Sequence, residues 1–248
     1  MKAMIFAAGL GSRLKPLTDN CPKALVPVGG KPLLEHVILR LKAAGFDHIV
    51  INIHHFGQQI IDFLAGNGNF GLRIDISDER DLLLDTGGAI KKARSLLDAK
   101  EPFLIHNVDI LTDLDPALFY KEHLRSGADA SLLTGRRDTS RYLLFDSSEK
   151  LQGWENRKTG EVKSAIPGFV KENSFPCAFG GIHLFSPVLF PLMDAWPDCF
   201  PVVDFYLAAA PHYRIQGYPF EGMWMDLGKP AALEEAERYW NTTPSSGR

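Results

Sequence analysis

The alternation of short apolar runs with amphipathic segments between Lys2 and His106 constrains the fold more than any other feature of the sequence. Strands are expected at Lys2–Ala7, His48–Ile53, Leu72–Ile76 and Phe103–His106, and helices at Leu33–Ala44, Gln58–Leu64 and Gly88–Leu97. Repeated β-α-β units form parallel sheets because each helix carries the chain back to the start of the next strand. The sequence therefore predicts an α/β fold: a doubly wound, mostly parallel, Rossmann-like mixed sheet flanked by helices, with ligands beyond the carboxyl ends of the strands.

The pattern changes after a helix that is expected from Asp115-Pro116 to about Arg125. Short strand-like stretches at 130–133, 142–145, 151–154 and 178–185 predict a mixed-sheet extension, followed by a helix at 203–210, strands at 213–218 and 223–225, and a helix at 230–240. No linker rich in proline, glycine or serine divides the chain. We therefore expect one domain, 1–248, made of halves 1–128 and 129–228 and a C-terminal helix at 229–241, with 242–248 frayed.

Composition excludes several classes of protein. The 27 Lys and Arg residues against 30 Asp and Glu give a net charge of -3, so a nucleic-acid backbone is not the expected partner. Three cysteines without C-x-x-C spacing argue against disulfides and structural zinc. The apolar run at the N-terminus stops at Gly9, too short for a signal sequence or a membrane span. We expect a cytoplasmic monomer or small homo-oligomer that binds neither nucleic acid nor membrane.

A glycine-rich loop follows the first expected strand. Ala8, Gly9, Leu10, Gly11 and Ser12 precede Arg13, and Lys23 follows ten residues later. Glycine lets backbone N–H groups approach phosphate oxygens, and nearby cations neutralise their charge. The P-loop motif is absent, and Leu14 stands where a dinucleotide-binding fingerprint needs its third glycine, which argues against an NAD-dependent oxidoreductase. Two glycines alone are equally compatible with a tight turn.

A longer pattern is more specific than the loop itself. It consists of Gly9-x-Gly11-x-Arg13, Pro22-Lys23-x-Leu25-x-Pro27, Gly30-Lys31-Pro32-Leu33 and Thr86-Gly87-Gly88. Together these segments resemble the signature of sugar-1-phosphate nucleotidylyltransferases, and the resemblance covers nearly the whole chain. It implies the nucleotide-diphospho-sugar transferase type of fold, with 1–128 binding nucleotide and 129–228 binding sugar. The implied substrates are a nucleoside triphosphate and a sugar 1-phosphate, and the implied cofactor is Mg²⁺.

The resemblance also implies roles for individual residues. Residues Ala8 to Ser12 hold the phosphates, Gly88 lies against the nucleobase, and Arg13 and Lys23 are catalytic. Asp109 and Asp226 are the implied magnesium ligands, and both follow apolar stretches that are expected to end at the ligand-binding edge of the sheet. Sugar contacts are implied for Asn107, Glu155 and Gly180. The structural alternative is a turn for Asn107 and a glycine-containing helix start for the segment with Gly88.

Some positions depart from the family pattern. Val108 stands where many relatives have glycine, so a slightly different metal geometry is expected. Asn156 replaces an expected lysine after Glu155. Asp113 and Asp115 are expected to serve a turn and a helix cap, and Asp204 is explained equally by a helix N-cap and by a substrate contact.

Chain length and shared stretches favour the members that transfer uridylyl from UTP to N-acetylmuramic acid 1-phosphate in cell-wall recycling. Guanylyl transfer to a mannose or heptose 1-phosphate is the alternative within the family. A catalytically silent nucleotide-sugar sensor is the alternative outside it. The joint presence of Arg13, Lys23, Asp109 and Asp226 favours an enzyme, because a sensor needs no complete set of reactive charges.

Overall fold

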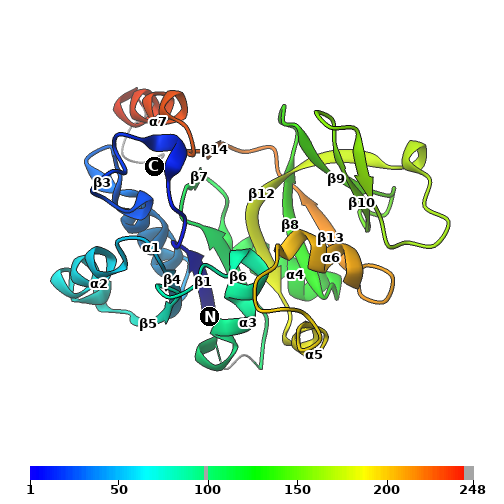
Figure 1. Cartoon of the computed structure of the whole chain (residues 1–248), viewed down its shortest axis with the longest axis horizontal. Coiled ribbons are helices and arrows are strands. Elements are labelled where there is room, and N and C mark those ends of the chain that lie inside the picture. Colours follow the sequence, from blue (N-terminus) through cyan, green and yellow to red (C-terminus); the bar gives the residue numbers. More distant parts are fainter. Residues whose placement is uncertain (98–99, 243–248) are drawn as a thin grey trace. The chain divides into compact units, whose positions relative to one another are not determined.

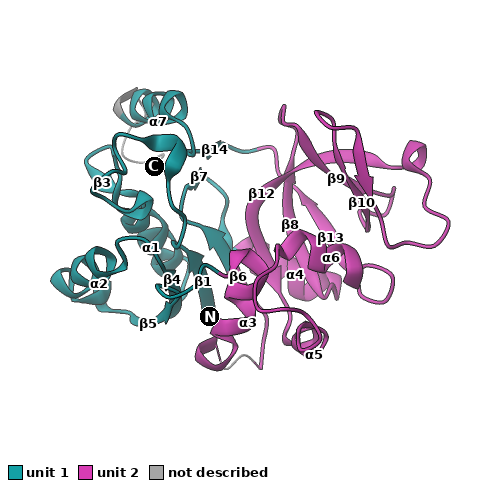
Figure 2. Ribbon diagram, viewed as in Figure 1, with its two compact units in different colours: residues 1–83, 105–117, 222–248 teal, residues 84–104, 118–221 magenta. Residues whose placement is uncertain are grey.

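The computed structural model describes residues 1–97 and 100–242, so the tail predicted to fray lies outside them except for Thr242. The chain forms two compact units, shown in teal and magenta in Figure 2. Unit 1 contains Met1–Leu83, Ile105–Ala117 and the segment from Gly222 onward, and unit 2 contains Leu84–Leu104 and Leu118–Glu221. The predicted halves run consecutively, whereas these units interleave along the chain.

Most of the parallel strand pairing involves strands of unit 1 (Figure 1). Strands β1 (Lys2–Phe6), β4 (His48–Ile53) and β5 (Arg73–Asp78) pair in parallel, and β6 (Phe103–Asn107) lies on the other side of β1. The strand order β6-β1-β4-β5 means that the chain changes direction across the sheet beside β1. Parallel sheets bind ligands at such a reversal, beyond the carboxyl ends of the strands.

Helices α1 (Leu33–Ala43) and α2 (Gly57–Gly66) connect these parallel strands. Helix α1 buries five apolar residues at helical spacing: Leu33, Leu34, Val37, Ile38 and Leu41. It ends before Gly45, which has a φ of 85° that favours glycine and turns the chain toward β4. Both helices were predicted from periodicity, and their observed bounds differ by one or two residues.

Smaller elements complete unit 1. They are the 3₁₀ turns η1 (Ser12–Leu14), η2 (Lys23–Leu25) and η3 (Gly68–Gly71), the strands β2 (Pro27–Val28), β3 (Lys31–Pro32), β7 (Ile110–Thr112) and β14 (Trp224–Asp226), and helix α7 (Pro230–Thr242). Helix α7 is fastened to the β2–β3 hairpin, because Gly29 N donates to Glu237 Oε1 at 2.9 Å and the Trp240 ring packs on Gly29. The C-terminal helix therefore stabilises the segment that follows Lys23.

Unit 2 contains the antiparallel extension. Its strands are β8 (Ala130–Gly135), β9 (Arg141–Phe145), β10 (Leu151–Asn156), β11 (Glu161–Lys163), β12 (Phe175–Phe185) and β13 (Ile215–Pro219). Its helices are α3 (Asp85–Leu97), α4 (Pro116–Ser126, which starts in unit 1), α5 (Phe190–Met193) and α6 (Val202–Ala209), with 3₁₀ turns η4 (Lys171–Asn173) and η5 (Pro187–Leu189). Strands β11-β10-β9-β12 and β12-β8 pair antiparallel, and β8-β13 pair in parallel.

An aromatic cluster forms the core of unit 2. Phe185 packs against Phe103 at 5.3 Å and Phe190 at 5.1 Å between ring centroids, and Tyr206 and Phe205 adjoin it. Phe185 and Phe205 are fully buried. These rings pack against one another inside unit 2.

The predicted α/β class, with a mixed and mostly parallel sheet flanked by helices, is confirmed. The parallel pairs predominate in unit 1 and the antiparallel pairs in unit 2. Strand β12 is longer than predicted, starting at Phe175, and β11 forms a hairpin with β10 that periodicity could not indicate in three residues. None of the described helices combines the length and apolar character that a membrane crossing requires.

Three buried histidines make the stability of the protein sensitive to acid. Burial lowers the pKa of His106 and His123 to about 4 and that of His183 to about 3. Between pH 6.5 and 4 the unfolded chain therefore binds protons that the folded chain excludes. Each histidine should lower the free energy of unfolding by about 1.4 kcal/mol per pH unit as the pH falls through this window.

Urea unfolding at pH 7 and pH 5.5 measures this loss of stability. His123→Gln is the test variant, because a glutamine side chain can keep hydrogen bonds with Ser131 and Ser186, which lie 2.8 and 3.1 Å from the ring nitrogens. The variant should lose less stability on acidification than the original chain. An equal loss in both proteins would contradict the assignment of His123 as a buried neutral group.

Candidate active site

The glycine loop after β1 offers free backbone donors. Among the described residues, no acceptor binds the backbone N–H groups of Leu10, Gly11 or Ser12. Gly11 has a φ of 65°, and its carbonyl accepts hydrogen bonds from Leu14 N and Thr18 Oγ1, both at 2.8 Å. The carbonyl is thus tied back into the protein while the N–H groups remain available. This arrangement suits an anion with several oxygen atoms.

A buried polar network supports the start of the loop. Ala7 N donates to Asn52 Oδ1 at 2.8 Å, and Asn52 Nδ2 donates to Glu79 Oε1 at 2.9 Å. Both side chains are buried. Sequence reasoning did not single out these residues, although polar side chains at the ends of β4 and β5 were the available signal.

Lys23 and Asp109 meet in an ion pair. Lys23 lies in η2 and is only 8% exposed, and its Nζ contacts Asp109 Oδ2. Asp109 follows β6, and Val108 N donates to Phe6 O at 3.1 Å, which fastens this segment to the end of β1. Val108 has no positive φ, so the position does not need the glycine of the family pattern. The predicted cation and the first predicted carboxylate are thus brought together.

The second carboxylate, Asp226, is placed beside the first by a short ladder. In the antiparallel pair β7–β14, Asp226 lies opposite Ile110, and Leu227 N donates to Asp109 O at 2.8 Å. Residues separated by more than a hundred positions therefore occupy neighbouring places at one strand end. An apolar stretch precedes each aspartate because β6 comes before Asp109 and Asp226 ends β14.

Arg13 borders the same carboxylate. A Cβ atom at Gly228 would lie 2.7 Å from Arg13 Nη2 and 2.9 Å from Asp226 Oδ1. Gly228 N also donates to Asp226 Oδ1 at 3.0 Å, which orients that carboxylate. Glycine at 228 leaves room for the guanidinium beside Asp226. Unit 1 thus gathers Arg13, Lys23, Asp109 and Asp226 around the glycine loop.

The donor set fits a magnesium ion better than a transition metal. Asp109 and Asp226 offer carboxylate oxygens, the hard ligands that Mg²⁺ prefers, and Mg²⁺ usually needs only one or two of them besides water and phosphate. Within the described ranges, no group of three or more His, Cys, Asp or Glu side chains could hold a metal ion alone. A site of two carboxylates completed by a phosphate-bearing ligand is consistent with both observations.

Gly88 belongs to unit 2, where its surroundings are filled by protein. Gly87 N and Gly88 N both donate to Phe200 O, at 2.8 and 3.3 Å. A Cβ atom at Gly88 would lie 1.9 Å from Asp198 O. Close packing against the segment 198–200 therefore explains why this helix start requires glycine, and contact with a nucleobase stays a prediction.

Glu155 is buried on one face of the antiparallel strands of unit 2. Its Oε1 accepts from Arg157 Nε at 2.8 Å and its Oε2 contacts Lys171 Nζ at 2.6 Å. Burial by itself would raise the pKa of Glu155, but hydrogen bonds from Lys171 and Arg157 outweigh it and lower the pKa. The three side chains border a pocket of about 370 Å³. The carboxylate is thus available to a ligand only through exchange of its ion pairs.

The other predicted sugar contacts belong to other strands than Glu155. Gly180 is in β12, and a Cβ atom there would lie 2.9 Å from Leu133 Cδ2, so packing on β8 explains the glycine. Asn107 ends β6 in unit 1, and its side chain makes no hydrogen bond within the described part of the chain. Sugar binding by these residues stays a prediction.

Asp115 was predicted to cap a helix, and Asp204 was left between a helix N-cap and a substrate contact. Asp115 Oδ1 accepts from Ala117 N at 2.9 Å, which caps α4 as predicted. Asp204 is not the N-cap of α6, because Pro201 holds that position and the helix starts at Val202, one residue earlier than predicted. Asp204 contacts Lys163 Nζ at 3.3 Å instead.

The comparisons with known proteins bear on this geometry. A family model described as Nucleotidyl transferase matches residues 2–145, more than half of the chain. The chain belongs to this family. The resemblance to sugar-1-phosphate nucleotidylyltransferases is thereby confirmed, and the matched segment includes Arg13, Lys23 and Asp109.

Two curated relatives of this nucleotidyl transferase are similar along nearly their whole length. An N-acetylmuramate alpha-1-phosphate uridylyltransferase from Caulobacter vibrioides is 34% identical, with 95% of each chain covered. One from Neisseria meningitidis serogroup B is 33% identical, with 96% of this chain and 97% of the relative covered. Among solved structures, a UDP-glucose pyrophosphorylase from Acinetobacter baumanii has a TM-score of 0.77 at 17% identity, with 99% of this chain and 95% of that chain covered. This last likeness shows the fold alone.

A pair of alanine substitutions tests the backbone conformation of the glycine loop. Gly11→Ala places a Cβ atom 2.8 Å from Thr18 Cγ2 at a positive φ, so a stability loss of about 1–2 kcal/mol is expected. Gly9→Ala meets no atom within 4 Å and should unfold at the original temperature. Thermal unfolding of both variants measures the difference. Equal destabilisation of the two would refute the assigned conformation of the loop.

Proposed function

We propose that this nucleotidyl transferase moves a uridylyl group from UTP to N-acetylmuramic acid 1-phosphate. An oxygen of the sugar phosphate attacks the α-phosphorus of UTP, the bond between the α-phosphorus and its bridging oxygen to the β-phosphorus breaks, and pyrophosphate leaves. Two polyanions must approach for this reaction. The observation that carries the proposal is the gathering of two cations, two carboxylates and free backbone donors in unit 1.

The chain's own residues act mainly by neutralising and positioning charge. The N–H groups of Leu10, Gly11 and Ser12 bind phosphate oxygens of UTP, held in place by the hydrogen bonds of Gly11 O. Arg13 suits a forked contact with the phosphates that leave, because a guanidinium presents two parallel donors. Lys23 stabilises the charge that builds up between the attacking phosphate and the α-phosphate. Its buried stem fixes where that positive charge lies.

Asp109 and Asp226 would hold the magnesium ion of the proposed reaction. When bound, Mg²⁺ supplies positive charge that polarises phosphate oxygens. Lys23 is the partner of Asp109 in this structure, so it neutralises the partly buried carboxylate. Because Asp226 Oδ1 accepts from Gly228 N, its orientation depends on protein contacts.

The choice of UTP and the muramic sugar rests on the two relatives from Caulobacter vibrioides and Neisseria meningitidis, whose names give this activity. A cytoplasmic enzyme of cell-wall recycling follows from these substrates, as the sequence predicts. A magnesium requirement belongs to the same proposal and is supported by the carboxylate pair.

Pyrophosphate release tests the choice of substrates. UTP, GTP, CTP, ATP and dTTP are each combined with the 1-phosphates of N-acetylmuramic acid, N-acetylglucosamine, glucose and mannose, with Mg²⁺ or with EDTA. The largest kcat/KM is expected for UTP with the muramic sugar, and EDTA should abolish it. A maximum with GTP and mannose 1-phosphate would replace the proposed substrates with the guanylyl alternative. Nucleotide binding without release in any combination would favour a sensor.

A further inference from the structure

One face of the antiparallel strands of unit 2 carries a pocket that the predicted site residues do not form. Arg141 of β9 lies opposite Asn156 of β10. Trp154 of β10 lies opposite Leu143 of β9 on one side and Lys163 of β11 on the other. Side chains at paired positions share a face of a sheet. Glu155 is adjacent to Trp154 in β10 and therefore lies on the opposite face, with the smaller pocket.

The pocket on the Trp154 face has a volume of about 490 Å³. The first turn of α6 and the segment before β9 border it. Its cations are Arg137, Arg141 and Lys163, and its anions are Glu161 and Asp204. Trp154 and Phe179 supply aromatic surface. A volume of this size accommodates a single sugar ring with substituents. Its lining combines aromatic surface with an excess of positive charge.

Lys163 is already engaged. Its Nζ lies 3.3 Å from Asp204 Oδ1, 3.7 Å from Glu161 Oε1 and 5.2 Å from the centre of the Trp154 ring. The two anions of the pocket are therefore both partners of the same lysine. They neutralise Lys163, and neither of them forms an ion pair with Arg141.

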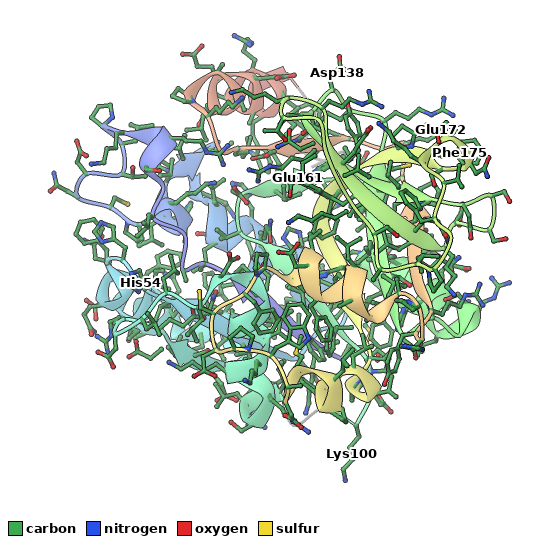
Figure 3. The ribbon with its side chains drawn as sticks, turned by 45° about the vertical axis from the view of Figure 1, so that its right-hand side comes forward. His54, Lys100, Asp138, Glu161, Glu172 and Phe175 are labelled. Atoms are coloured by element: carbon green, nitrogen blue, oxygen red, sulfur yellow. The ribbon has the colours of Figure 1, made fainter. Side chains whose placement is uncertain are left out.

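Arg141 differs from Lys163 in this respect. Within residues 1–97 and 100–242, its guanidinium has no ion pair, hydrogen bond or ring contact. The cross-strand neighbour Asn156 uses its Oδ1 to accept from Lys158 N at 3.0 Å. Asp138, the acidic residue of the preceding loop, projects outward at the surface (Figure 3), and Glu161 pairs with Lys163. A forked, permanently charged donor thus borders the pocket without a protein acceptor.

We infer that Arg141 binds a carboxylate carried by the acceptor sugar and so makes this enzyme selective for an acidic sugar 1-phosphate. The inference rests on the proposed function. N-acetylmuramic acid differs from N-acetylglucosamine by an ether-linked lactyl group, whose carboxylate matches the two parallel donors of a guanidinium. The aromatic surface of the pocket covers the less polar part of the ring. Arg141 is a specificity residue: it contacts the substituent and takes no part in phosphoryl transfer.

Calorimetric titration of the full chain tests the inference with two acceptors, N-acetylmuramic acid 1-phosphate and N-acetylglucosamine 1-phosphate. Arg141→Ala should weaken binding of the muramic sugar by about 10- to 100-fold and change binding of the other sugar by less than about twofold. Arg141→Lys should recover part of the loss, because it restores charge without the fork. Arg136→Ala removes an exposed arginine of the neighbouring loop outside the pocket and is the matched control, expected to bind both sugars as the original chain does.

Two results would overturn the inference: equal binding of the two sugars by the original chain, or an equal effect of Arg141→Ala on both. Pyrophosphate release from UTP, measured in the same preparations, reports separately on the proposed function. Release with an unselective pocket removes only the role of Arg141. Selective binding without release removes only the proposed reaction. Thermal unfolding of each variant verifies the fold, and Arg141→Gln replaces the alanine variant if that variant does not fold.

Discussion

Asp109→Asn and Asp226→Asn are each expected to lower kcat by roughly 1000-fold while the protein stays folded. Asparagine keeps the shape of the side chain but removes the negative charge that a magnesium ion needs. The expected loss corresponds to about 4 kcal/mol of transition-state stabilisation. Steady-state pyrophosphate release at saturating UTP measures kcat, and the magnesium dependence of the residual rate shows whether the metal is bound more weakly.

Asp113→Asn is the control for these two variants. Asp113 lies four residues after Asp109, directly after β7, and is exposed. It should leave kcat within about twofold of the original value, as surface substitutions away from a site usually do. Near-normal rates for both Asp109→Asn and Asp226→Asn would contradict the proposed metal site. An equal loss in Asp113→Asn would show that the rate depends on the negative charge of the region and not on the two carboxylates that the β7–β14 ladder places side by side.

Lys23→Ala is expected to lower kcat by about 100- to 1000-fold with a smaller change in KM, because a preorganised charge acts most strongly on the transition state. The same change leaves Asp109 without its partner inside the site. The variant should therefore also lose some stability, which magnesium should partly restore. Kinetics with varied UTP and thermal unfolding with and without Mg²⁺ measure the two effects.

Lys31→Ala is the matched control for Lys23→Ala. Lys31 belongs to the same family motif region but lies at the surface, 3.1 Å from Glu35 in an i,i+4 pair that contributes little. The Lys31→Ala variant should keep the kcat of the original chain. If Lys23→Ala raised KM and left kcat intact, Lys23 would contribute to ground-state binding alone, and its place in the proposed mechanism would be lost.

The fold could be predicted from local patterns wherever the hydrophobic period was long enough. Helix α1 buries apolar side chains at helical spacing and strand β4 is buried along its whole length, and both were located within a residue or two. Strand β11 has three residues, all exposed, and exists because it pairs with β10. The interleaving of the units also escaped prediction, because the return of the C-terminal segment to unit 1 depends on the β7–β14 ladder.

The candidate site shows the same division. Gly11, Lys23 and the two aspartates could be named in advance because the sequence shows the motifs of the family, and both aspartates follow apolar stretches. Pairing across strands was not visible. Trp154 and Glu155 are neighbours in sequence yet face different pockets. Arg141 lies on the same face of the sheet as Trp154 because of the register between β9 and β10.

The most direct measurement is identification of the products formed from UTP and N-acetylmuramic acid 1-phosphate by the purified full chain with Mg²⁺. Mass spectrometry should find the uridine diphosphate sugar, and a coupled assay should find pyrophosphate in an equal amount. Omission of either substrate should abolish both products. If UTP binds but neither product forms with the muramic sugar or with any other sugar 1-phosphate tested, the account of the site as a nucleotidyl-transfer centre is contradicted.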